Sequence, residues 1–363
     1  MKRIKVNLGK RSYAIVIGKG ILKYLPVYLK PLNLPRELFV VTNSQIKNQY
    51  GARLKACLKK GGFSFKFYTT MDSEKAKSIN NAVKLIEFLA DYAKQKKIAV
   101  AAFGGGVVGD LSSFIASIYK RGVPLIQVPT TLLAQIDSSI GGKTAIDLKM
   151  AKNLIGTFYQ PSIVFCDMDL LMTLDKKQLC AGLSEAVKYA IIGDAKLFRF
   201  LEEKYQSVFS KDAQALERLV FECARIKARI IELDEKEEKG IRTVLNFGHT
   251  IGHAIEAAGD YGKYSHGDAV ALGMLASLRI SQSMGLLDFM VYQRITNLMA
   301  SIGLPQEIEG IKEKDVLTAY KLDKKFIGKT NRFVLLKGIA KAVVRNNIPE
   351  KVIYKAVREL FVS

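Results

Sequence analysis

The chain has 363 residues, too many for one ordinary hydrophobic core, so we expect two domains. Hydrophobic residues make up 49% and charged residues 25%, a balance typical of soluble globular proteins. No segment is apolar enough to be a signal peptide or a membrane span, and the four cysteines show no CxxC spacing. We therefore expect a cytoplasmic protein with no membrane partner, no disulfide framework and no cysteine zinc site.

The formal net charge is +22. Such an excess fits a nucleic-acid partner, an anionic small substrate or a proteome rich in lysine. Nucleic-acid binders usually concentrate basic residues on a stripe or tail, whereas here they are spread through the chain. The charge therefore favours an anionic metabolite, and we expect no nucleic-acid partner.

The first half of the chain alternates strand-like and helix-like patterns. Two β-branched runs at 4–8 and 13–18 predict a hairpin. Amphipathic stretches at 43–60 and 75–97 predict helices. Further strands are predicted at 38–42, 63–69, 98–103, 125–129 and 163–167. This alternation is typical of βαβ units around a mostly parallel sheet.

From about Leu170 onward the hydrophobic pattern is mostly helical, with a small hairpin predicted from the runs FVLL and KAVV near the end. We therefore expect an α/β, Rossmann-like nucleotide-binding domain at 1–170 and a mainly α-helical domain at 171–363. A site in a cleft between the two domains is the expected arrangement.

The segment FGGGVVGD at 103–110 follows a predicted strand and opens a helix. Gly104, Gly106 and Gly109 have the spacing GxGxxG, which lets backbone amides approach a pyrophosphate at a helix N-terminus. As a dinucleotide fingerprint the match is incomplete. The loop is not at the first βα turn, and no acidic residue follows about twenty positions later. A nucleotide site is favoured over a purely structural turn.

The segment 128–161 combines paired threonines, a second pair of glycines and spaced lysines. It is typical of a polyanion-binding segment, and a surface loop is the alternative. The density of its polar side chains favours binding; they are Thr130, Thr131, Asp137, Lys143, Lys152 and Asn153.

All three histidines of the chain lie in one stretch, at 249, 253 and 266. Their clustering favours one functional site over ordinary helix residues, because imidazole binds metals and moves protons near neutral pH. The spacing alone points to His249 and His253, four residues apart as in helical zinc motifs. Glu185 is a candidate third ligand, although Glu185 and Lys188 also have the spacing of a surface ion pair.

Together these segments resemble the 3-dehydroquinate synthases, members of the sugar phosphate cyclases. The resemblance lies in GGGVVGDLSSFIASIYKRGVPLIQVPTTLLAQIDSSIGGKTAIDLKMAKNLIGTFYQP, GLSEAVKYAIIG, RTVLNFGHTIGHAIE and SHGDAVALGM. It extends from the N-terminal hairpin to LDKKFIGKTNRFVLLKGIAKAVV, nearly the whole chain. It implies an NAD-binding domain at 1–170 and a metal- and substrate-binding domain at 171–363.

The resemblance implies a lyase of the shikimate pathway, in aromatic amino-acid biosynthesis. Its substrate would be a small anionic sugar phosphate, 3-deoxy-D-arabino-heptulosonate 7-phosphate, and its products 3-dehydroquinate and phosphate. The implied steps are transient oxidation at C5 by NAD, phosphate elimination, reduction back, ring opening and intramolecular aldol closure. Tightly held NAD, one divalent metal (zinc or cobalt) and a homodimer belong to the same expectation.

The resemblance also assigns roles to individual residues. It gives the metal to Glu185, His249 and His266, and makes His253 a proton-transfer group instead of the ligand that spacing suggests. The other catalytic positions implied are Asp137, Lys143, Lys188, Lys227, Arg242 and Asn246. Contacts with the substrate are implied for Lys152, Asn153, one lysine of the pair Lys324 and Lys325, and Arg121, which would reach the partner subunit's site.

The NAD positions implied by the resemblance fall in several segments of the first domain. They are Asp72, Ser73, Glu74, Lys75, Ala76, Lys77, Gly105, Gly106, Val107, Val108, Gly109, Asp110, Thr130, Thr131, Leu133, Asp137, Ser138, Lys143, Lys152, Leu170, Leu171, Met172 and Thr173. The chain departs from the family at Asn43, where an aspartate usually holds the adenosine ribose, and at Gln178, where a glutamate is expected. Both departures remove negative charge and bear on NAD affinity more than on the reaction.

Two alternatives share parts of this pattern. One is another sugar phosphate cyclase, such as an aminodehydroquinate synthase. The other is a metal-dependent polyol or alcohol dehydrogenase, with a similar glycine loop. Stoichiometry separates them, because a dehydrogenase accumulates NADH whereas a cyclase releases phosphate without net NADH.

Overall fold

The computed structural model describes residues 1–148, 151–327 and 331–361, with the side chains in these ranges except those of 151 and 323–327. The contacts divide the chain into two compact units. The first comprises Met1–Leu174 and Ala213–Lys236, and the second Asp175–Asp212 and Glu237–Ser363. The sequence predicted a single division at residue 170. The structure divides the chain nearby, at Leu174, but helix α7 (Ala213–Leu233) groups with the first unit because it packs on strands β1 and β2.

The first unit is built on a seven-stranded sheet with the order β1-β2-β9-β6-β5-β3-β4. β1 and β2 form an antiparallel hairpin and the other pairs are parallel, which confirms the mostly parallel sheet expected from the sequence. The strands are β1 (Lys2–Val6), β2 (Tyr13–Gly18), β3 (Glu37–Asn43), β4 (Ser64–Thr70), β5 (Ile98–Gly104), β6 (Leu125–Pro129) and β9 (Ile163–Asp167).

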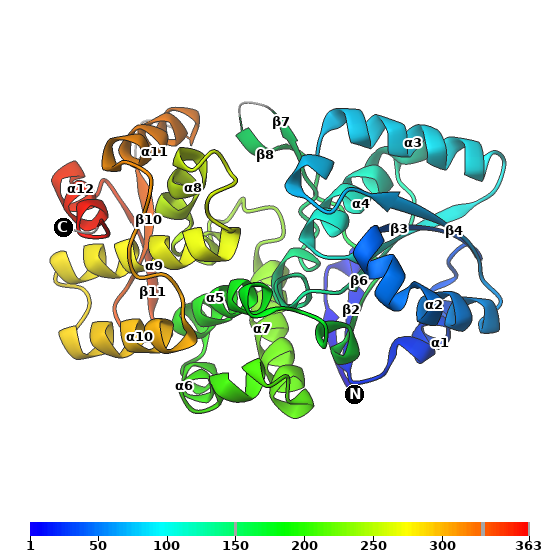
Figure 1. Ribbon diagram of the computed structural model, residues 1–363, viewed down its shortest axis with the longest axis horizontal. Coiled ribbons are helices and arrows are strands. Elements are labelled where there is room, and N and C mark those ends of the chain that lie inside the picture. Colours follow the sequence, from blue (N-terminus) through cyan, green and yellow to red (C-terminus); the bar gives the residue numbers. More distant parts are fainter. Residues whose placement is uncertain (149–150, 328–330, 362–363) are drawn as a thin grey trace. The chain divides into compact units, whose positions relative to one another are not determined.

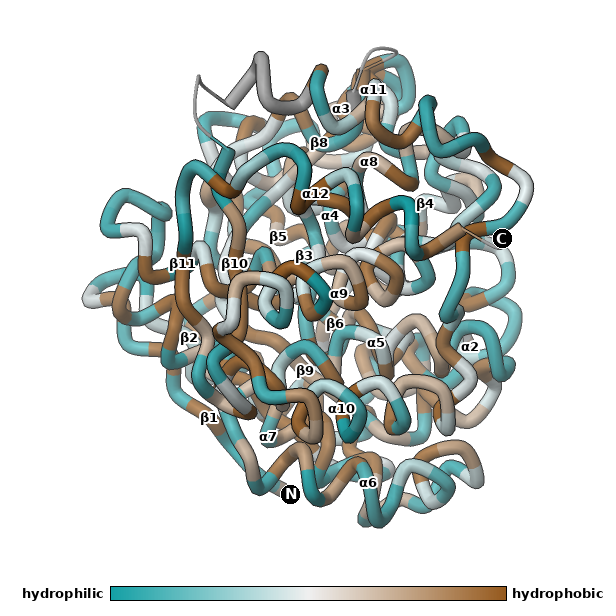
Figure 2. Tube along the Cα trace, turned by 90° about the vertical axis from the view of Figure 1, so that its left-hand side faces the viewer, coloured by the Kyte–Doolittle hydropathy of each residue, from teal (hydrophilic) through white to brown (hydrophobic). Residues whose placement is uncertain are grey.

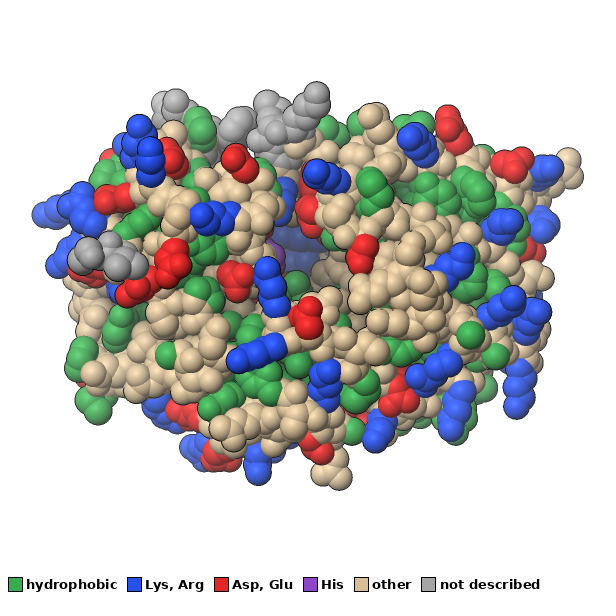
Figure 3. All heavy atoms as spheres, viewed as in Figure 1, with side chains coloured by type: hydrophobic (Ala, Val, Ile, Leu, Met, Phe, Trp, Pro, Cys, Tyr) green, Lys and Arg blue, Asp and Glu red, His purple; other side chains and the backbone are tan. Residues whose placement is uncertain are grey.

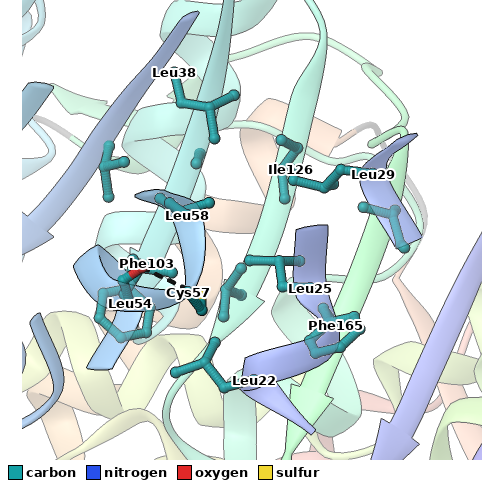
Figure 4. Close-up of a cluster of buried hydrophobic side chains, with 14 of the residues drawn as sticks. Leu22, Leu25, Leu29, Leu38, Leu54, Cys57, Leu58, Phe103, Ile126 and Phe165 are labelled. Atoms are coloured by element: carbon teal, nitrogen blue, oxygen red, sulfur yellow. Dashed lines mark hydrogen bonds between the residues drawn. The ribbon is translucent and has the colours of Figure 1, made fainter. Parts of the chain in front are cut away.

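Helices cover both faces of this sheet (Figure 1). Leu38 and Val40 of β3 pack beneath α1 (Leu25–Leu29) and α2 (Ser44–Lys60), whereas Phe39 and Val41 point to the opposite face. That opposite face is covered by α3 (Ile79–Ala93) and α4 (Gly106–Ile118). Figure 4 shows the core under α1 and α2, where leucines from both helices meet aromatic rings of the strands.

Two parts of the first unit differ from the elements that the sequence predicted. The helix predicted at 75–97 begins only at Ile79, because Ser78 caps it and Glu74–Ala76 forms a separate 3₁₀ turn. A short antiparallel pair, β7 (Ile146–Leu148) and β8 (Ala151–Ile155), lies in the segment read as a polyanion-binding loop and was not predicted.

The second unit is mainly helical and contains the predicted C-terminal hairpin of β10 (Arg332–Leu336) and β11 (Ala342–Asn346). α12 (Glu350–Arg358) buries Ile353, Ala356 and Val357. Figure 2 shows hydrophobic and hydrophilic residues following one another along this helix. The other helices are α5 (Lys176–Gly193), α6 (Ala195–Phe209), α8 (His249–Ala258), α9 (His266–Ser283), α10 (Phe289–Ile302) and α11 (Glu313–Ile327).

The lysine and arginine side chains are distributed over the face shown in Figure 3, with acidic and hydrophobic side chains between them. They do not gather over one element of that face, which repeats the even spread along the sequence. In the described part of the chain, no helix combines the length and the apolar character needed to cross a membrane.

Candidate active site

Glycines let three helices of the second unit, α5, α8 and α9, approach one another closely. A Cβ atom on Gly273 of α9 would lie 1.9 Å from the backbone oxygen of Gly248, and one on Gly267 would lie 2.4 Å from the backbone of α5. Gly248 also begins α8 with a left-handed φ of 81°, which favours glycine. This packing brings the first turns of α8 and α9 against the middle of α5.

The close packing gathers Glu185 from α5, His249 from α8 and His266 from α9. The Oε1 atom of Glu185 lies 3.7 Å from Nε2 of His249 and 3.5 Å from Nε2 of His266. One ligand atom of each residue lies within 4.8 Å of the others. A tetrahedral zinc ion with bonds of about 2.0–2.1 Å separates its ligand atoms by about 3.4 Å. The donor set and its spacing therefore fit one divalent metal ion.

The second nitrogen of each imidazole faces a protein acceptor. Nδ1 of His249 lies 3.2 Å from the backbone oxygen of Phe247, and Nδ1 of His266 lies 3.4 Å from Oε2 of Glu256. Protons placed on Nδ1 by these acceptors leave both Nε2 lone pairs directed toward Glu185, the arrangement of metal-bound histidines. The sequence did not predict the role of Glu256, since its contact depends on how α8 packs against α9.

The charges around this group favour a cation. Glu185 is completely buried and pairs with the equally buried Lys188. Burial lowers the pKa of His266, but Glu185 and Glu256 outweigh burial and raise that pKa to about 10. Burial and the charge of Lys188 hold the pKa of His249 well below its usual value. The acids that favour a proton on Nε2 of His266 also favour a divalent cation in the place of that proton.

His253 lies beside the group without belonging to it. Its ring centroid is 5.4 Å from that of His249 and 6.5 Å from that of His266. Among the described residues, the only set of side chains placed to hold a metal is Glu185, His249 and His266. The geometry therefore favours the ligand set that the resemblance implied over the His249 and His253 pair that spacing suggested.

Other predicted residues of the second unit lie near the start of α8 or beyond the described side chains. The buried Arg242 begins the 3₁₀ turn Arg242–Asn246, and its Nε lies 3.6 Å from Oε1 of Glu237. Asn246 is exposed at the end of this turn. The side chains of Lys324 and Lys325 lie outside the described residues.

In the first unit, the glycine loop packs against the segment that follows β6. A Cβ atom on Gly105 would lie 3.1 Å from a methyl carbon of Thr131, and one on Gly106 would lie 3.2 Å from the hydroxyl of Ser138. A Cβ atom on Gly104 would lie 2.7 Å from the side chain of Val108, so Val108 leaves no room for a larger residue at this position. The two predicted nucleotide segments therefore form one surface at the carboxyl ends of β5 and β6.

The buried Lys77 is the centre of a polar network beside this surface. Its Nζ lies 3.0 Å from Oδ2 of Asp110, 3.1 Å from Oε1 of Glu74 and 4.0 Å from Oδ1 of Asp147, and donates to Oδ1 of Asn153 at 2.6 Å. Burial lowers the pKa of Lys77, but the carboxylates outweigh burial and raise it. Burial raises the pKa of the Asp110 carboxyl, because the smaller opposite effect of the Lys77 charge does not cancel it. The structure thus joins Asn153, predicted to contact substrate, to the predicted NAD positions.

Asp137 and Lys227 form a second charged pair in the first unit. Asp137 lies in the π-helical turn Ala134–Ser138, and Lys227 projects from α7. The Lys227 ammonium pairs with the Asp137 carboxylate and donates to its backbone oxygen at 2.8 Å, although the two residues are 90 positions apart. The sequence assigned Lys227 to the second domain, but α7 places it in the first unit.

The remaining predicted positions of the first unit differ in exposure. Thr173 accepts or donates a hydrogen bond with Tyr50 at 2.9 Å. The exposed positions are Asp72, Ser73, Lys75, Arg121 and Lys143. The buried positions are Ala76, Val108, Gly109, Thr130, Leu170 and Leu171. The positions of intermediate exposure are Val107, Leu133, Lys152 and Met172.

Both departures from the family pattern have a local structural role. Asn43 caps α2 by accepting from the backbone N–H of Ile46 at 2.8 Å, and its amide donates to Oδ1 of Asp72 at 2.6 Å. Gln178 completes a capping box at the start of α5 with Asp175.

The sequence matches known proteins along most of its length. Residues 67–181 match the family described as 3-dehydroquinate synthase N-terminal, and residues 182–326 match 3-dehydroquinate synthase C-terminal. The chain is also 40% identical to the 3-dehydroquinate synthase of Desulforamulus reducens over 351 residues, which cover 96% of this chain and 98% of that protein. The chain belongs to the 3-dehydroquinate synthase family.

Solved structures of related cyclases share the fold of this 3-dehydroquinate synthase family member. One is the 2-epi-5-epi-valiolone synthase of Streptomyces hygroscopicus with NAD⁺ and Zn²⁺ bound, with a TM-score of 0.88, 26% identity and 98% of each chain covered. Another is a 2-deoxy-scyllo-inosose synthase complexed with carbaglucose-6-phosphate, NAD⁺ and Co²⁺, with a TM-score of 0.88, 26% identity and 99% and 100% coverage.

The fold extends to dehydrogenases. The NADH-dependent butanol dehydrogenase A of Thermotoga maritima aligns with a TM-score of 0.68 and 15% identity over 96% of both chains. At that identity the likeness shows the fold alone. The α/β Rossmann-like unit with a mainly helical second unit is thus the architecture that the sequence predicted.

Proposed function

We propose that the chain converts 3-deoxy-D-arabino-heptulosonate 7-phosphate to 3-dehydroquinate and phosphate, as a phosphorus–oxygen lyase of the shikimate pathway. The similarity to 3-dehydroquinate synthases over almost the whole chain supports this reaction. The observation that carries it is the Glu185, His249 and His266 group, in which both Nδ1 atoms face protein acceptors and both Nε2 atoms face Glu185.

The enzyme uses NAD and one divalent metal, zinc or cobalt. When bound, NAD supplies reversible hydride transfer and the metal supplies polarisation of a substrate oxygen. Glu185, His249 and His266 hold the metal. The glycine loop and the adjoining segment at Thr130 and Ser138 contact NAD, with Asp110 oriented by Lys77.

Cations of the chain bind the anionic substrate, because its phosphate and carboxylate need charge-assisted donors. Lys152, Lys143 and Arg242 have this role, and Lys188 adds positive charge beside Glu185. His253 moves a proton next to the metal group; its exposure and the 5.4 Å between its ring and that of His249 support this role. Asp137 is held by Lys227, so its carboxylate has a fixed position.

The experiment that tests this function follows phosphate release and NADH absorbance in one cuvette with the heptulosonate phosphate, NAD and zinc. Phosphate release at constant NADH, lost with a chelator, is the expected result. Accumulation of NADH without phosphate would show a dehydrogenase instead. Release from other sugar phosphates but not from this one would show another cyclase, such as the aminodehydroquinate synthase considered from the sequence.

We also propose that the enzyme is a homodimer in which Arg121 reaches the partner subunit's site. The exposure of Arg121 supports this role. Mixing Arg121→Ala and Glu185→Gln chains tests it, because a mixed dimer would keep one site with both groups intact. Recovery of about a quarter of the activity is expected from random pairing, and no recovery would contradict the assignment.

We propose a cytoplasmic location. All four cysteines are buried free thiols, a state that a reducing compartment maintains. Fractionation of cells that produce the chain should recover it with cytoplasmic markers, and recovery with membranes would contradict the proposal.

A further inference from the structure

The turn Tyr119–Arg121, which follows α4, holds Arg121 in an unfavourable backbone conformation. Lys120 and Arg121 have positive φ angles of 47° and 66°, in the left-handed region that side chains other than glycine rarely adopt. Gly122 continues the turn with a φ of 121°. A strained backbone of this kind persists only where surrounding contacts hold it, and it is common at binding and catalytic sites. The contacts that hold this turn therefore bear on the role of Arg121.

Tyr159 contacts the turn through its hydroxyl. The hydroxyl donates to the backbone oxygen of Val123 at 2.8 Å, and a Cβ atom on Gly122 would lie 3.2 Å from the hydroxyl oxygen. The ring of Tyr159 packs against the core that α3 and α4 share with the sheet. Burial raises the pKa of this hydroxyl, which therefore keeps its proton and remains a donor. The side chain thus fixes the residues that end the turn of Arg121.

The backbone of Tyr159 is held in turn by the loop that carries Lys143. Its N–H donates to the backbone oxygen of Gly142 at 2.7 Å, and the preceding residue, Phe158, pairs with Lys143 in an antiparallel bridge. Tyr159 therefore has a fixed position from which its hydroxyl reaches the turn. It joins a segment proposed to bind substrate in its own subunit to the turn of Arg121.

We propose that Tyr159 is a positioning residue for Arg121, whose guanidinium it directs toward the anionic substrate in the partner subunit's site. The proposal rests on the proposed function and on the proposed homodimer. A guanidinium on a fixed turn binds a phosphate or carboxylate more tightly than one on a mobile turn, because less conformational freedom is lost on binding. Since Arg121 acts in the partner, loss of the Tyr159 hydroxyl should affect the partner's site.

Steady-state kinetics of the zinc-loaded chain with NAD and the heptulosonate phosphate test this role. Tyr159→Phe keeps the ring and the backbone contacts but removes the hydroxyl, so KM should rise about fivefold while kcat, zinc content and Tm change little. In the Arg121→Ala background the same substitution should raise KM no further, because the two residues act as a unit. Tyr28→Phe, which removes a hydroxyl contact with Met1 on the other face of the sheet, is the matched control and should leave KM unchanged.

Mixed dimers show in which subunit the hydroxyl acts. A dimer of one Tyr159→Phe chain and one Glu185→Gln chain, isolated through two affinity tags, has a single site with Glu185. The Arg121 of that site comes from the chain that keeps Tyr159, so the site should have the wild-type KM. A raised KM in this mixed dimer, an unchanged KM in Tyr159→Phe, or a further rise in the double variant would overturn the positioning role alone. A wild-type chain that releases no phosphate would overturn the proposed function and with it this assignment.

Discussion

The Lys77 network of the first unit and the Glu185 group of the second unit each have a buried charge at their centre, but they favour different ligands. Lys77 is surrounded by Glu74, Asp110, Asp147 and the amide of Asn153, so protein groups satisfy its charge. In the second unit, contacts at Nδ1 orient the imidazoles of His249 and His266. Their Nε2 atoms are left facing the Glu185 carboxylate. The first arrangement presents fixed dipoles and carboxylates to a nucleotide, whereas the second favours a cation.

Loss of a metal ligand should have the largest effect. His249→Ala removes one of three protein donors, so bound zinc should fall to near zero and phosphate release should drop at least about a thousandfold. Metal analysis and the phosphate assay check this, and NAD affinity should be unchanged because the first unit is intact. His253→Ala is the matched control, since it should lower turnover while zinc remains; equal zinc loss in both variants would contradict the ligand set.

Removal of the positive charge of Lys77 should chiefly reduce the stability of the fold. Lys77 is only 3% exposed, so Lys77→Met leaves three partly exposed carboxylates without their cation and should lower the free energy of unfolding by about 2 kcal/mol. Denaturant unfolding measures this change. Lys75→Met, at an exposed position of the same turn, should cost less than about 0.5 kcal/mol. Equal stability of the two variants would show that the network does not stabilise the fold.

A smaller effect is expected from Glu256, which contacts the metal ligand His266. Glu256→Gln keeps an acceptor near Nδ1 of His266 but removes its charge, so zinc affinity should fall about tenfold while the Kd for NAD stays constant. Competition with a zinc-binding dye measures the affinity. The exposed Glu307→Gln is the control, and an affinity equal to wild type in Glu256→Gln would remove Glu256 from the site.

The smallest effect is expected at a partly exposed substrate lysine. Lys152→Ala should raise KM for the heptulosonate phosphate by about threefold to fivefold, because a solvated cation contributes modestly to anion binding. Steady-state kinetics measure it beside Lys97→Ala, an exposed control on the surface of the first unit. An unchanged KM would count against the role of Lys152.

Local pattern was sufficient to predict the strands of the sheet, the hairpins at 4–18 and 332–346 and the glycine loop, because each depends on neighbouring residues. Contacts between distant segments were not predictable in this way. The pairing of Lys227 with Asp137 depends on α7 returning to the first unit, and the contact of Glu256 with His266 depends on the crossing of α8 and α9.

The histidines show the same limit at the level of one site. Spacing along a helix favoured His249 and His253, since residues four apart share a face. Glycine contacts between helices instead place His266 with His249 and Glu185. The residue types therefore indicated a metal site, and only tertiary packing or family resemblance could select its ligands.

The most direct test measures zinc content and NAD affinity on the same preparations of wild type, Glu185→Gln and Asp110→Asn. If the second unit holds the metal and the first holds NAD, Glu185→Gln should lose zinc and keep NAD affinity, and Asp110→Asn should show the reverse. Loss of both ligands in each folded variant, or zinc retained in Glu185→Gln, would contradict the separate assignment of the two regions.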